Sequence, residues 1–136
     1  MGVTRAVAAA SMLLAAVGAV EAASAGAAQA ASGPKPIQLV LTVAKGDSTQ
    51  PAQRRASLRC QPAGGSHHQA REACAQLARV GGRFDKLQLG GGLCTMQWDP
   101  VTVTASGRWK GRKVAYQHTF GNACTLQTTT GPVFSL

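Results

Sequence analysis

The sequence predicts an α+β domain in which two short helices cover a mainly antiparallel, five-stranded sheet. Short segments with alternating apolar residues recur along the chain, and one longer stretch has its apolar residues at helical spacing. The connections between these segments are short, which is typical of strands that pair with their neighbours. Four cysteines add two predicted disulfides, which would brace the modest core of a small domain.

The predicted strands are short segments with a two-residue repeat. In the segment 101–105, the two valines and the alanine are expected to face the core and the two threonines the solvent. Glycine and proline residues follow several of these segments and indicate turns. The five predicted strands are 37–44, 53–60, 101–105, 113–120 and 133–136.

One clear helix is predicted at 69–80. Its apolar residues recur at three- and four-residue spacing, and Gly81-Gly82 ends the pattern. Ser66 is the candidate for capping its start. A second short helical or turn segment is expected within 84–89, just before a run of glycines.

Residues 1–30 are predicted to be a secretory signal peptide. Arg5 precedes an uncharged apolar run at 6–20, and small residues suited to signal cleavage follow, with a favoured cut after Ala30. Glu21 interrupts the run, which is too short for a membrane span. An anchored amphipathic helix is the less favoured alternative.

The remainder, 31–136, is predicted to form one exported domain with a short N-terminal arm at 31–36. We therefore expect a secreted, extracellular protein that has no membrane partner after the signal is removed. All four cysteines lie in this part, and an even number in an exported protein indicates disulfides.

The cysteines alone do not fix their partners. Cys60, Cys74, Cys94 and Cys124 allow three pairings. A four-cysteine metal site is the alternative, but zinc sites usually contain close pairs such as Cys-x-x-Cys, and none occurs here. We predict two disulfides, no metal and no cofactor.

The chain is strongly basic, with a formal net charge of +9. The tightest cluster consists of Arg108, Lys110, Arg112 and Lys113 at an expected hairpin turn. A solvated basic face is the favoured interpretation, and a cationic protein that binds polyanions or surfaces is the alternative. Trp109 is a single aromatic residue in the cluster and no nucleic-acid fold signature accompanies it, so no nucleic-acid partner is predicted.

Catalysis is not predicted. The exported part has three histidines and four acidic residues, but it has no nucleophile elbow and no zinc-protease helix motif. Cysteines held in disulfides are not available as nucleophiles. His67 and His68 lie beside glycine and serine, and we expect both in an exposed loop.

The candidate functional site is the stretch 90–100. Three glycines lead into Cys94, and Pro100 favours an extended conformation at Asp99. A disulfide at Cys94 would tether this segment with Met96 near its crest, which is the shape in which proteases bind substrates. The alternative role for Met96 is packing in the core, where methionine is common.

The loop and its surroundings resemble the subtilisin inhibitor-like family of secreted proteins. The resemblance covers nearly the whole exported part and includes four cysteines in the family order, followed after the loop by Asp-Pro-Val. The matching segments are 39–46 (LVLTVAKG), 56–62 (ASLRCQP), 73–82 (ACAQLARVGG), 94–101 (CTMQWDPV), 107–111 (GRWKG), 120–124 (FGNAC) and 133–136 (VFSL).

The resemblance implies a tight-binding, substrate-like inhibitor of serine proteases whose reactive bond is Met96–Gln97. Met96 would be the P1 residue and Gln97 the P1′ residue. Trp98 is expected to contact the enzyme, with bracing of the loop as its alternative role, and Asp99 to orient the loop by hydrogen bonds. The protease-contact loop would consist of Leu93, Cys94, Thr95, Trp98 and Asp99.

The same resemblance implies the disulfides Cys60–Cys74 and Cys94–Cys124 and a homodimer formed by sheet faces. The chain departs from the family pattern at Thr95, where proline is typical, and at the following polar P1′ residue, where an apolar one is typical. These departures concern target preference. The expected partners are subtilisin-like serine endopeptidases and some chymotrypsin-like ones, because an uncharged P1 methionine does not suit the acidic S1 pocket of trypsin.

Overall fold

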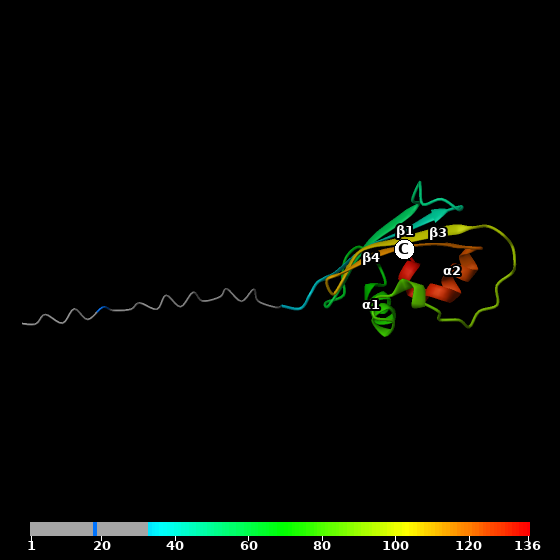
Figure 1. Cartoon of the computed structure of the whole chain (residues 1–136). Helices are drawn as coiled ribbons and strands as arrows, with labels where there is room; N and C mark the ends of the chain where they lie inside the picture. The colour runs from blue at the N-terminus through cyan, green and yellow to red at the C-terminus, as the bar shows by residue number, and fades with distance from the viewer. Residues whose placement is uncertain (1–17, 19–32) are drawn as a thin grey trace, which may run out of the picture. The chain divides into compact units, whose positions relative to one another are not determined.

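The structure, a computed structural model, describes residue 18 and residues 33–136 (Figure 1). The predicted signal peptide, 1–30, lies outside the described residues except at position 18, and so do the first two residues of the predicted arm. In the described part of the chain, no helix is long and apolar enough to cross a membrane.

The core of the domain is a four-stranded antiparallel sheet with the strand order β2-β1-β3-β4. Its register places Leu41 opposite both Ala56 and Ala105, and Ala105 opposite Tyr116. These residues form one row across the face that the helices cover. The strands are β1 (Ile37–Lys45), β2 (Arg54–Cys60), β3 (Val101–Trp109) and β4 (Arg112–Phe120).

The helices lie on one side of this sheet and leave its other face free of helices (Figure 1). They are α1 (Ala70–Arg79), the 3-10 helix η1 (Phe84–Lys86), α2 (Ala123–Thr130) and the 3-10 helix η2 (Gly131–Phe134). The largest fully buried apolar side chains come from the sheet, α1 and η2: Leu41, Leu58, Leu77, Val103 and Val133. This contact between the layers supplies the apolar burial that stabilises the domain.

The predicted α+β class is confirmed, but the fifth strand is wrong. The segment 133–136 does not pair with the sheet, and it begins in η2, where Pro132 occupies the first turn. Val133 and Phe134 are both buried although they are adjacent in the sequence. A strand would send neighbouring side chains to opposite faces, whereas a helical turn lets both reach the core.

The helix predicted at 69–80 is present as α1, and the short helical or turn segment expected within 84–89 is present as η1. The second α-helix, α2, was not predicted. Three of the eight residues of α2 are consecutive threonines, whose β-branched side chains are poor helix formers. The capping residue Asn122 compensates, because its side chain accepts a hydrogen bond from the main-chain N–H of Thr125.

Three further local expectations need correction. β3 continues through Gly107, which lies so close to β1 that a side chain there would collide with the Gln38 carbonyl. Thr102 is buried rather than solvent-facing, because its hydroxyl donates to the Gly46 carbonyl at 2.8 Å. The hydroxyl of Ser66 accepts from the Ser57 main chain and does not cap α1.

His67 was expected in an exposed loop but is only 4% exposed. Its Nε2 donates to the Val133 carbonyl at 3.0 Å, and its Nδ1 accepts from the Gln69 main-chain N–H at 3.0 Å. These two bonds connect the start of α1 to η2, so His67 has a structural role. His68 is exposed, as expected.

Candidate functional site

The loop between η1 and β3 carries three large apolar side chains in solvent. Leu93 is fully exposed, Met96 is 97% exposed and Trp98 is 71% exposed. The core-packing alternative for Met96 is therefore excluded. Apolar side chains of this size are normally buried at least in part, so three of them within six residues mark a surface for interaction.

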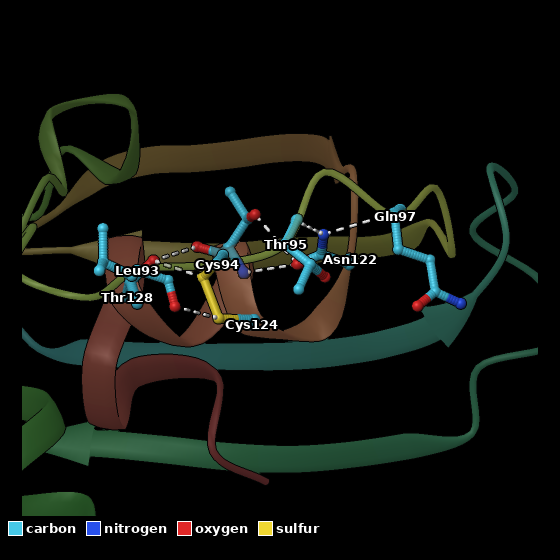
Figure 2. Close-up of a disulfide and its surroundings, with 8 residues drawn as sticks. Leu93, Cys94, Thr95, Gln97, Asn122, Cys124 and Thr128 are labelled. Carbon is cyan, nitrogen blue, oxygen red and sulfur yellow. Dashed lines mark hydrogen bonds between the residues drawn. A yellow bond between two sulfur atoms is a disulfide. The ribbon is translucent and has the colours of Figure 1, made fainter.

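A disulfide attaches this loop to α2. Cys94 is bonded to Cys124 with a Cα–Cα distance of 5.7 Å, which is the pairing that the resemblance implies. Cys124 lies in the first turn of α2, and the loop runs past it as an extended segment (Figure 2). The attachment point is therefore two residues before Met96.

Asn122 holds the loop on both sides of Met96. Its side-chain Nδ2 donates to the carbonyl of Thr95 at 3.0 Å and to the carbonyl of Gln97 at 2.9 Å (Figure 2). Its Oδ1 accepts from the main-chain N–H and the hydroxyl of Thr125, at 2.9 and 3.0 Å. The same side chain thus caps α2 and fixes the main chain that flanks the candidate reactive bond.

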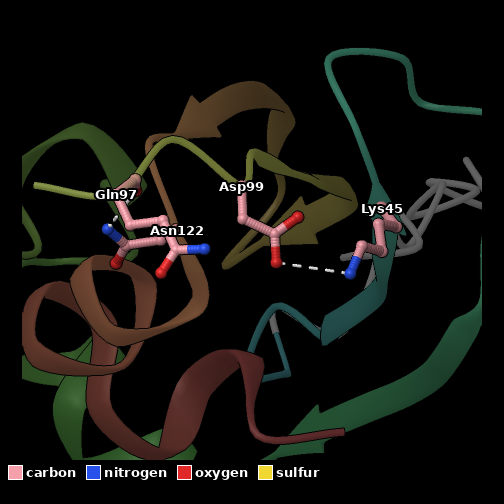
Figure 3. A network of polar contacts seen from close by, with 4 residues as sticks. All are labelled: Lys45, Gln97, Asp99 and Asn122. Carbon is pink, nitrogen blue, oxygen red and sulfur yellow. Dashed lines mark hydrogen bonds and ion pairs between the residues drawn. The ribbon is translucent and has the colours of Figure 1, made fainter. Parts of the chain in front are cut away.

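The segment after this bond is held by the strands beneath it. The main-chain N–H of Asp99 donates to the Gly121 carbonyl at 2.9 Å, and its carboxylate accepts from Lys45 Nζ at 3.3 Å (Figure 3). Pro100 accepts at its carbonyl from the Gly46 N–H at 2.7 Å. Asp99 thus makes the orienting hydrogen bonds that we expected of it.

The ion pair between Lys45 and Asp99 orients the end of the loop but adds little to the stability of the fold. Both side chains are more than half exposed, at 61% and 53%. Exposed pairs of this kind contribute little, because water and salt screen the charges and both side chains lose freedom. Its role is to fix where β1 and the end of the loop lie relative to each other.

Trp98 is partly packed and partly exposed. One part of the indole lies over Gly121, where a methyl group would stand 3.6 Å from Trp98 Cε3. The rest of the ring is open to solvent. Bracing of the loop and contact with a bound protein are therefore compatible in one side chain.

The segment before the bond packs against the far end of α2. The main-chain N–H of Leu89 donates to the carbonyl of Thr129 at 3.1 Å. Gly92 approaches Thr128 so closely that a side chain at this position would overlap with the threonine methyl group. Glycine is therefore required where the loop passes over α2.

The structure brings all the predicted loop residues together around one exposed methionine, and it adds residues that the sequence analysis did not identify. Asn122, Lys45 and Thr128 were not singled out as members of the site. Asn122 could have been recognised, because an asparagine two residues before Cys124 is a typical helix-capping residue. Lys45 and Thr128 reach the site through tertiary contacts that leave no local sequence signal.

The described residues contain no cluster of three or more His, Cys, Asp or Glu that could hold a metal ion. The four cysteines form two disulfides, the second of which, Cys60–Cys74, joins β2 to α1. The exposed apolar side chains that the loop offers to a partner are Leu93, Met96 and Trp98.

Comparison with known proteins identifies what this arrangement is similar to. The sequence profile described as "Subtilisin inhibitor-like" matches residues 35–122. Subtilisin inhibitor-like protein 5 from Streptomyces fradiae is 50% identical over 104 residues, which cover 74% of this chain and 97% of the relative. The Transglutaminase-activating metalloprotease inhibitor of Streptomyces mobaraensis is 43% identical, over 73% of this chain and 70% of the relative.

A solved structure shares the fold. Streptomyces caespitosus sermetstatin, crystallised in complex with Bacillus licheniformis subtilisin, has a TM-score of 0.64 and is 35% identical. The similarity covers 74% of this chain and 99% of sermetstatin.

Proposed function

We propose, because this chain belongs to the subtilisin inhibitor-like family, that it is a secreted, tight-binding and substrate-like inhibitor of subtilisin-like serine proteases. The bond offered to the enzyme is Met96–Gln97. The family consists of protease inhibitors and not of enzymes, so protease inhibition is the supported class of function. The reactive bond, the mechanism and the target are our proposals.

One observation carries the proposal: a fully exposed Met96 lies between two main-chain carbonyls that Asn122 holds. A protease binds its substrate as an extended segment with the P1 side chain pointing into a pocket. A flexible peptide loses much conformational freedom when it adopts this shape, whereas a loop that is already fixed does not. The fixed loop therefore binds more tightly than a peptide of the same sequence.

In the proposed complex, Met96 occupies the S1 pocket of the enzyme. Leu93, three residues earlier and equally exposed, occupies the S4 pocket. The main chain between them pairs with the edge of the enzyme cleft as an added strand. Thr95 and the disulfide-bonded Cys94 lie between these two anchors and keep the segment extended.

The loop resists digestion because both products of cleavage stay in place. Attack by the catalytic serine on the Met96 carbonyl would give an acyl-enzyme and a free amine on Gln97. The disulfide of Cys94 holds the acyl side, and Asn122 holds the Gln97 carbonyl on the amine side. The amine remains beside the ester at a high effective concentration, so re-formation of the peptide bond competes with hydrolysis.

The target preference follows from the chemistry of P1. Methionine is apolar and unbranched, so it fits broad apolar S1 pockets and offers no charge to an acidic one. The complex of sermetstatin with subtilisin supports a subtilisin-like target. Because another relative is named an inhibitor of a metalloprotease, a metalloprotease belongs in the enzyme panel as a second candidate target.

Two further parts of the proposal follow from the sequence and the resemblance. Residues 1–30 direct export, after which the disulfides form outside the cell. Two copies associate through the helix-free face of the sheet, where Val40 and Ala115 lie in the same row of the register. Sedimentation of the exported domain at micromolar concentration tests the dimer.

Titration of the exported domain, 31–136, against subtilisin tests the main proposal. We expect loss of enzyme activity that is linear in inhibitor up to one equivalent per active site. Mass spectrometry of the long-incubated complex should find cleavage at Met96–Gln97 and nowhere else in the loop. Cleavage at a different bond would place the reactive site elsewhere.

A P1 exchange tests the assignment of Met96. Met96→Lys should weaken inhibition of subtilisin by roughly tenfold or more, because a charge enters an apolar pocket, and should create inhibition of trypsin. Gln88→Lys adds the same charge at an exposed position before the glycine run and should change neither activity. If Met96→Lys inhibits subtilisin unchanged and gains nothing against trypsin, the assignment is wrong.

A further inference from the structure

We propose that the end of the sheet opposite the Met96 loop binds a linear polymer of phosphate groups. Five cationic side chains form this surface, which we call the basic end: Lys35, Arg59, Arg108, Lys110 and Lys113. Binding of such a polymer would be separate from protease inhibition, and it would anchor the inhibitor to a phosphate-bearing surface while its loop stays free.

The register of the sheet places three of these cations in one row. Gln38 in β1 lies opposite Arg59 in β2 on one side and Arg108 in β3 on the other, and Arg108 lies opposite Lys113 in β4. The row therefore crosses all four strands of the helix-free face, one row beyond the Val40–Ala115 row of the proposed dimer contact and closer to the turn between β3 and β4. With neighbouring strands about 4.8 Å apart, it extends over roughly 14 Å.

Two lysines lie beside this row, Lys110 in the turn between β3 and β4 and Lys35 in the segment before β1. The stem of Lys35 packs against Gly111, where a methyl group would stand 2.9 Å from the lysine Cδ. Lys35 and Lys110 line a shallow hollow of about 320 Å³ together with Pro34 and Gln61. The hollow continues the cationic row around the end of the sheet.

Both arginines of the basic end contact neighbouring residues that restrain them. Arg108 Nη1 donates to the Gly111 carbonyl at 3.0 Å. The guanidinium of Arg59 lies over Gly64, where a methyl group would stand 3.3 Å from its Nη2. Side chains that are already restrained lose less conformational freedom when they bind a ligand.

The basic end has no internal carboxylate to neutralise it. The part of the chain that the structure describes contains two ion pairs, Lys45–Asp99 and Lys86–Asp85, and neither involves a residue of the basic end. Arg108 and Lys113, moreover, are like charges in directly opposed positions, which destabilises a sheet. An anionic ligand would relieve this repulsion.

The surroundings favour phosphate groups over nucleic-acid bases. Trp109, the aromatic residue in this part of the sequence, is only 5% exposed and packs against Gly82, so it offers no ring for base stacking. None of the five residues is aromatic. Arginine presents a planar fork of N–H donors that matches phosphate oxygens in pairs, and the lysines add charge without sequence selectivity.

The two surfaces are far enough apart to work at the same time. β3 begins five residues after Met96 and ends at Trp109 beside the basic end, so its nine residues separate the surfaces by about 30 Å. Figure 1 shows the long loop before β3 at one end of the sheet and the turn between β3 and β4 at the other. A protease on the loop would leave the basic end uncovered.

Long-chain inorganic polyphosphate is the probe for the first test, with the exported domain, 31–136, in isothermal titration calorimetry over a series of NaCl concentrations. Five phosphate contacts predict a slope of log K against log salt of roughly −3.5, which is about a hundredfold weakening between 50 and 200 mM salt. A slope near zero, or no binding at 50 mM salt, would overturn the proposal.

A matched pair of variants separates the surface from net charge. Arg108→Gln with Lys113→Gln removes two charges from the basic end, and Arg71→Gln with Lys86→Gln removes two exposed charges elsewhere, so both variants have a formal net charge of +7 instead of +9. We expect at least a tenfold loss of polyphosphate affinity for the first variant and less than a threefold loss for the second. Equal losses would show that net charge alone drives binding.

Two further binding experiments test where the polymer binds and which class of ligand the site accepts. Single-stranded DNA with the same number of phosphates should bind no more tightly than polyphosphate. Tighter binding of DNA would mean that the site also contacts bases or sugars, which would contradict the proposal. Polyphosphate should bind a preformed complex with subtilisin within threefold of its affinity for the free domain. Loss of binding in that complex would place the site at the loop instead.

Discussion

Asn122 and Cys124 hold one loop from the first turn of a single helix, and their two attachments enclose Met96. The disulfide of Cys124 enters the loop before Met96. The amide of Asn122 donates to the main-chain carbonyls on both sides of it. Because both attachments start from the same end of α2, we expect the two sides of the proposed reactive bond to keep their positions when the bond is cut.

Removing the Asn122 side chain should weaken inhibition and should let the protease hydrolyse the inhibitor faster. Asn122→Ala deletes two hydrogen bonds to the loop, each contributing about 1 kcal/mol. We therefore expect inhibition of subtilisin to weaken by roughly ten- to a hundredfold, together with faster hydrolysis of Met96–Gln97. Slow-binding kinetics and mass spectrometry of the complex over time measure both effects.

Asn122→Asp separates this effect from loss of the helix cap. An aspartate keeps the oxygen that accepts from the Thr125 main-chain N–H, so it preserves the cap of α2. It cannot donate to the two loop carbonyls. If Asn122→Asp inhibits as well as the parent chain while Asn122→Ala does not, the hydrogen bonds to the loop are unimportant and the cap explains the loss.

The two disulfides should have different functions although both stabilise the fold. Replacing Cys94 and Cys124 by serine opens a loop with a sequence separation of 30, and replacing Cys60 and Cys74 opens one of 14. The chain-entropy model gives a loss of about 3 to 4 kcal/mol in each case. Only the first change releases the acyl side of the reactive bond.

We therefore expect the Cys94→Ser, Cys124→Ser variant to be hydrolysed by subtilisin at least about tenfold faster than the Cys60→Ser, Cys74→Ser variant. The comparison is made at a temperature at which circular dichroism shows both variants folded. Equal rates of hydrolysis would indicate that general loss of stability, and not the tether, controls cleavage.

The sequence predicted those parts of the fold that local patterns encode. Alternation identified the four strands because each has one face against the helices, and the Gly81-Gly82 stop marked the end of α1 within one residue. The segment 133–136 was wrongly predicted to be a strand. Its two apolar residues are adjacent, and a short apolar pair does not distinguish a strand from a helical turn. α2 was missed because its stability comes from a cap and a disulfide.

The candidate site likewise has a part that was predicted from local sequence and a part that was not. Glycines, a cysteine and a proline around Met96 were sufficient to predict an exposed tethered loop. The support beneath it comes from Asn122, Lys45 and Thr128, which are far from the loop in sequence. Asn122 can be recognised as a helix-capping residue, but the contacts of all three residues with the loop depend on how α2 and β1 pack under it, and a single sequence carries no signal for that packing.

Gly82 should be far less tolerant of substitution than its neighbour Gly81. Both have positive φ angles, 73° and 62°, so alanine at either position is strained by about 1 to 2 kcal/mol. A methyl group on Gly82 would also overlap with the indole ring of Trp109, whereas Gly81 faces open space. Overpacking of this kind adds roughly 1 to 3 kcal/mol.

Urea unfolding measures this difference directly, because the two variants share the backbone strain and differ in the contact with Trp109. We expect the free energy of unfolding of Gly82→Ala to be lower than that of Gly81→Ala by roughly 1 to 3 kcal/mol, the cost of overpacking against Trp109. Similar midpoints for the two variants would mean that the indole moves aside without cost and that its packing on Gly82 does not contribute to stability.

Tyr116 should ionise at a higher pH in the folded domain than in the unfolded chain. Burial among core side chains raises the pKa of this phenol above 10, and the nearby negative charge of Asp85 raises it further. Tyr116 is the only tyrosine in the sequence, so absorbance at 295 nm during an alkaline titration reports this one group. The midpoint should fall near pH 10 when the chain is unfolded in guanidinium.

The same pKa difference makes stability depend on pH in the alkaline range. Above pH 10 the unfolded chain loses the Tyr116 proton while the folded domain keeps it, so the unfolded state binds fewer protons and the free energy of unfolding falls as pH rises. Below pH 10 the phenol is neutral in both states and contributes no slope. Tyr116→Phe should flatten the alkaline part of the stability curve, and a curve that keeps its full slope would show that other groups cause it.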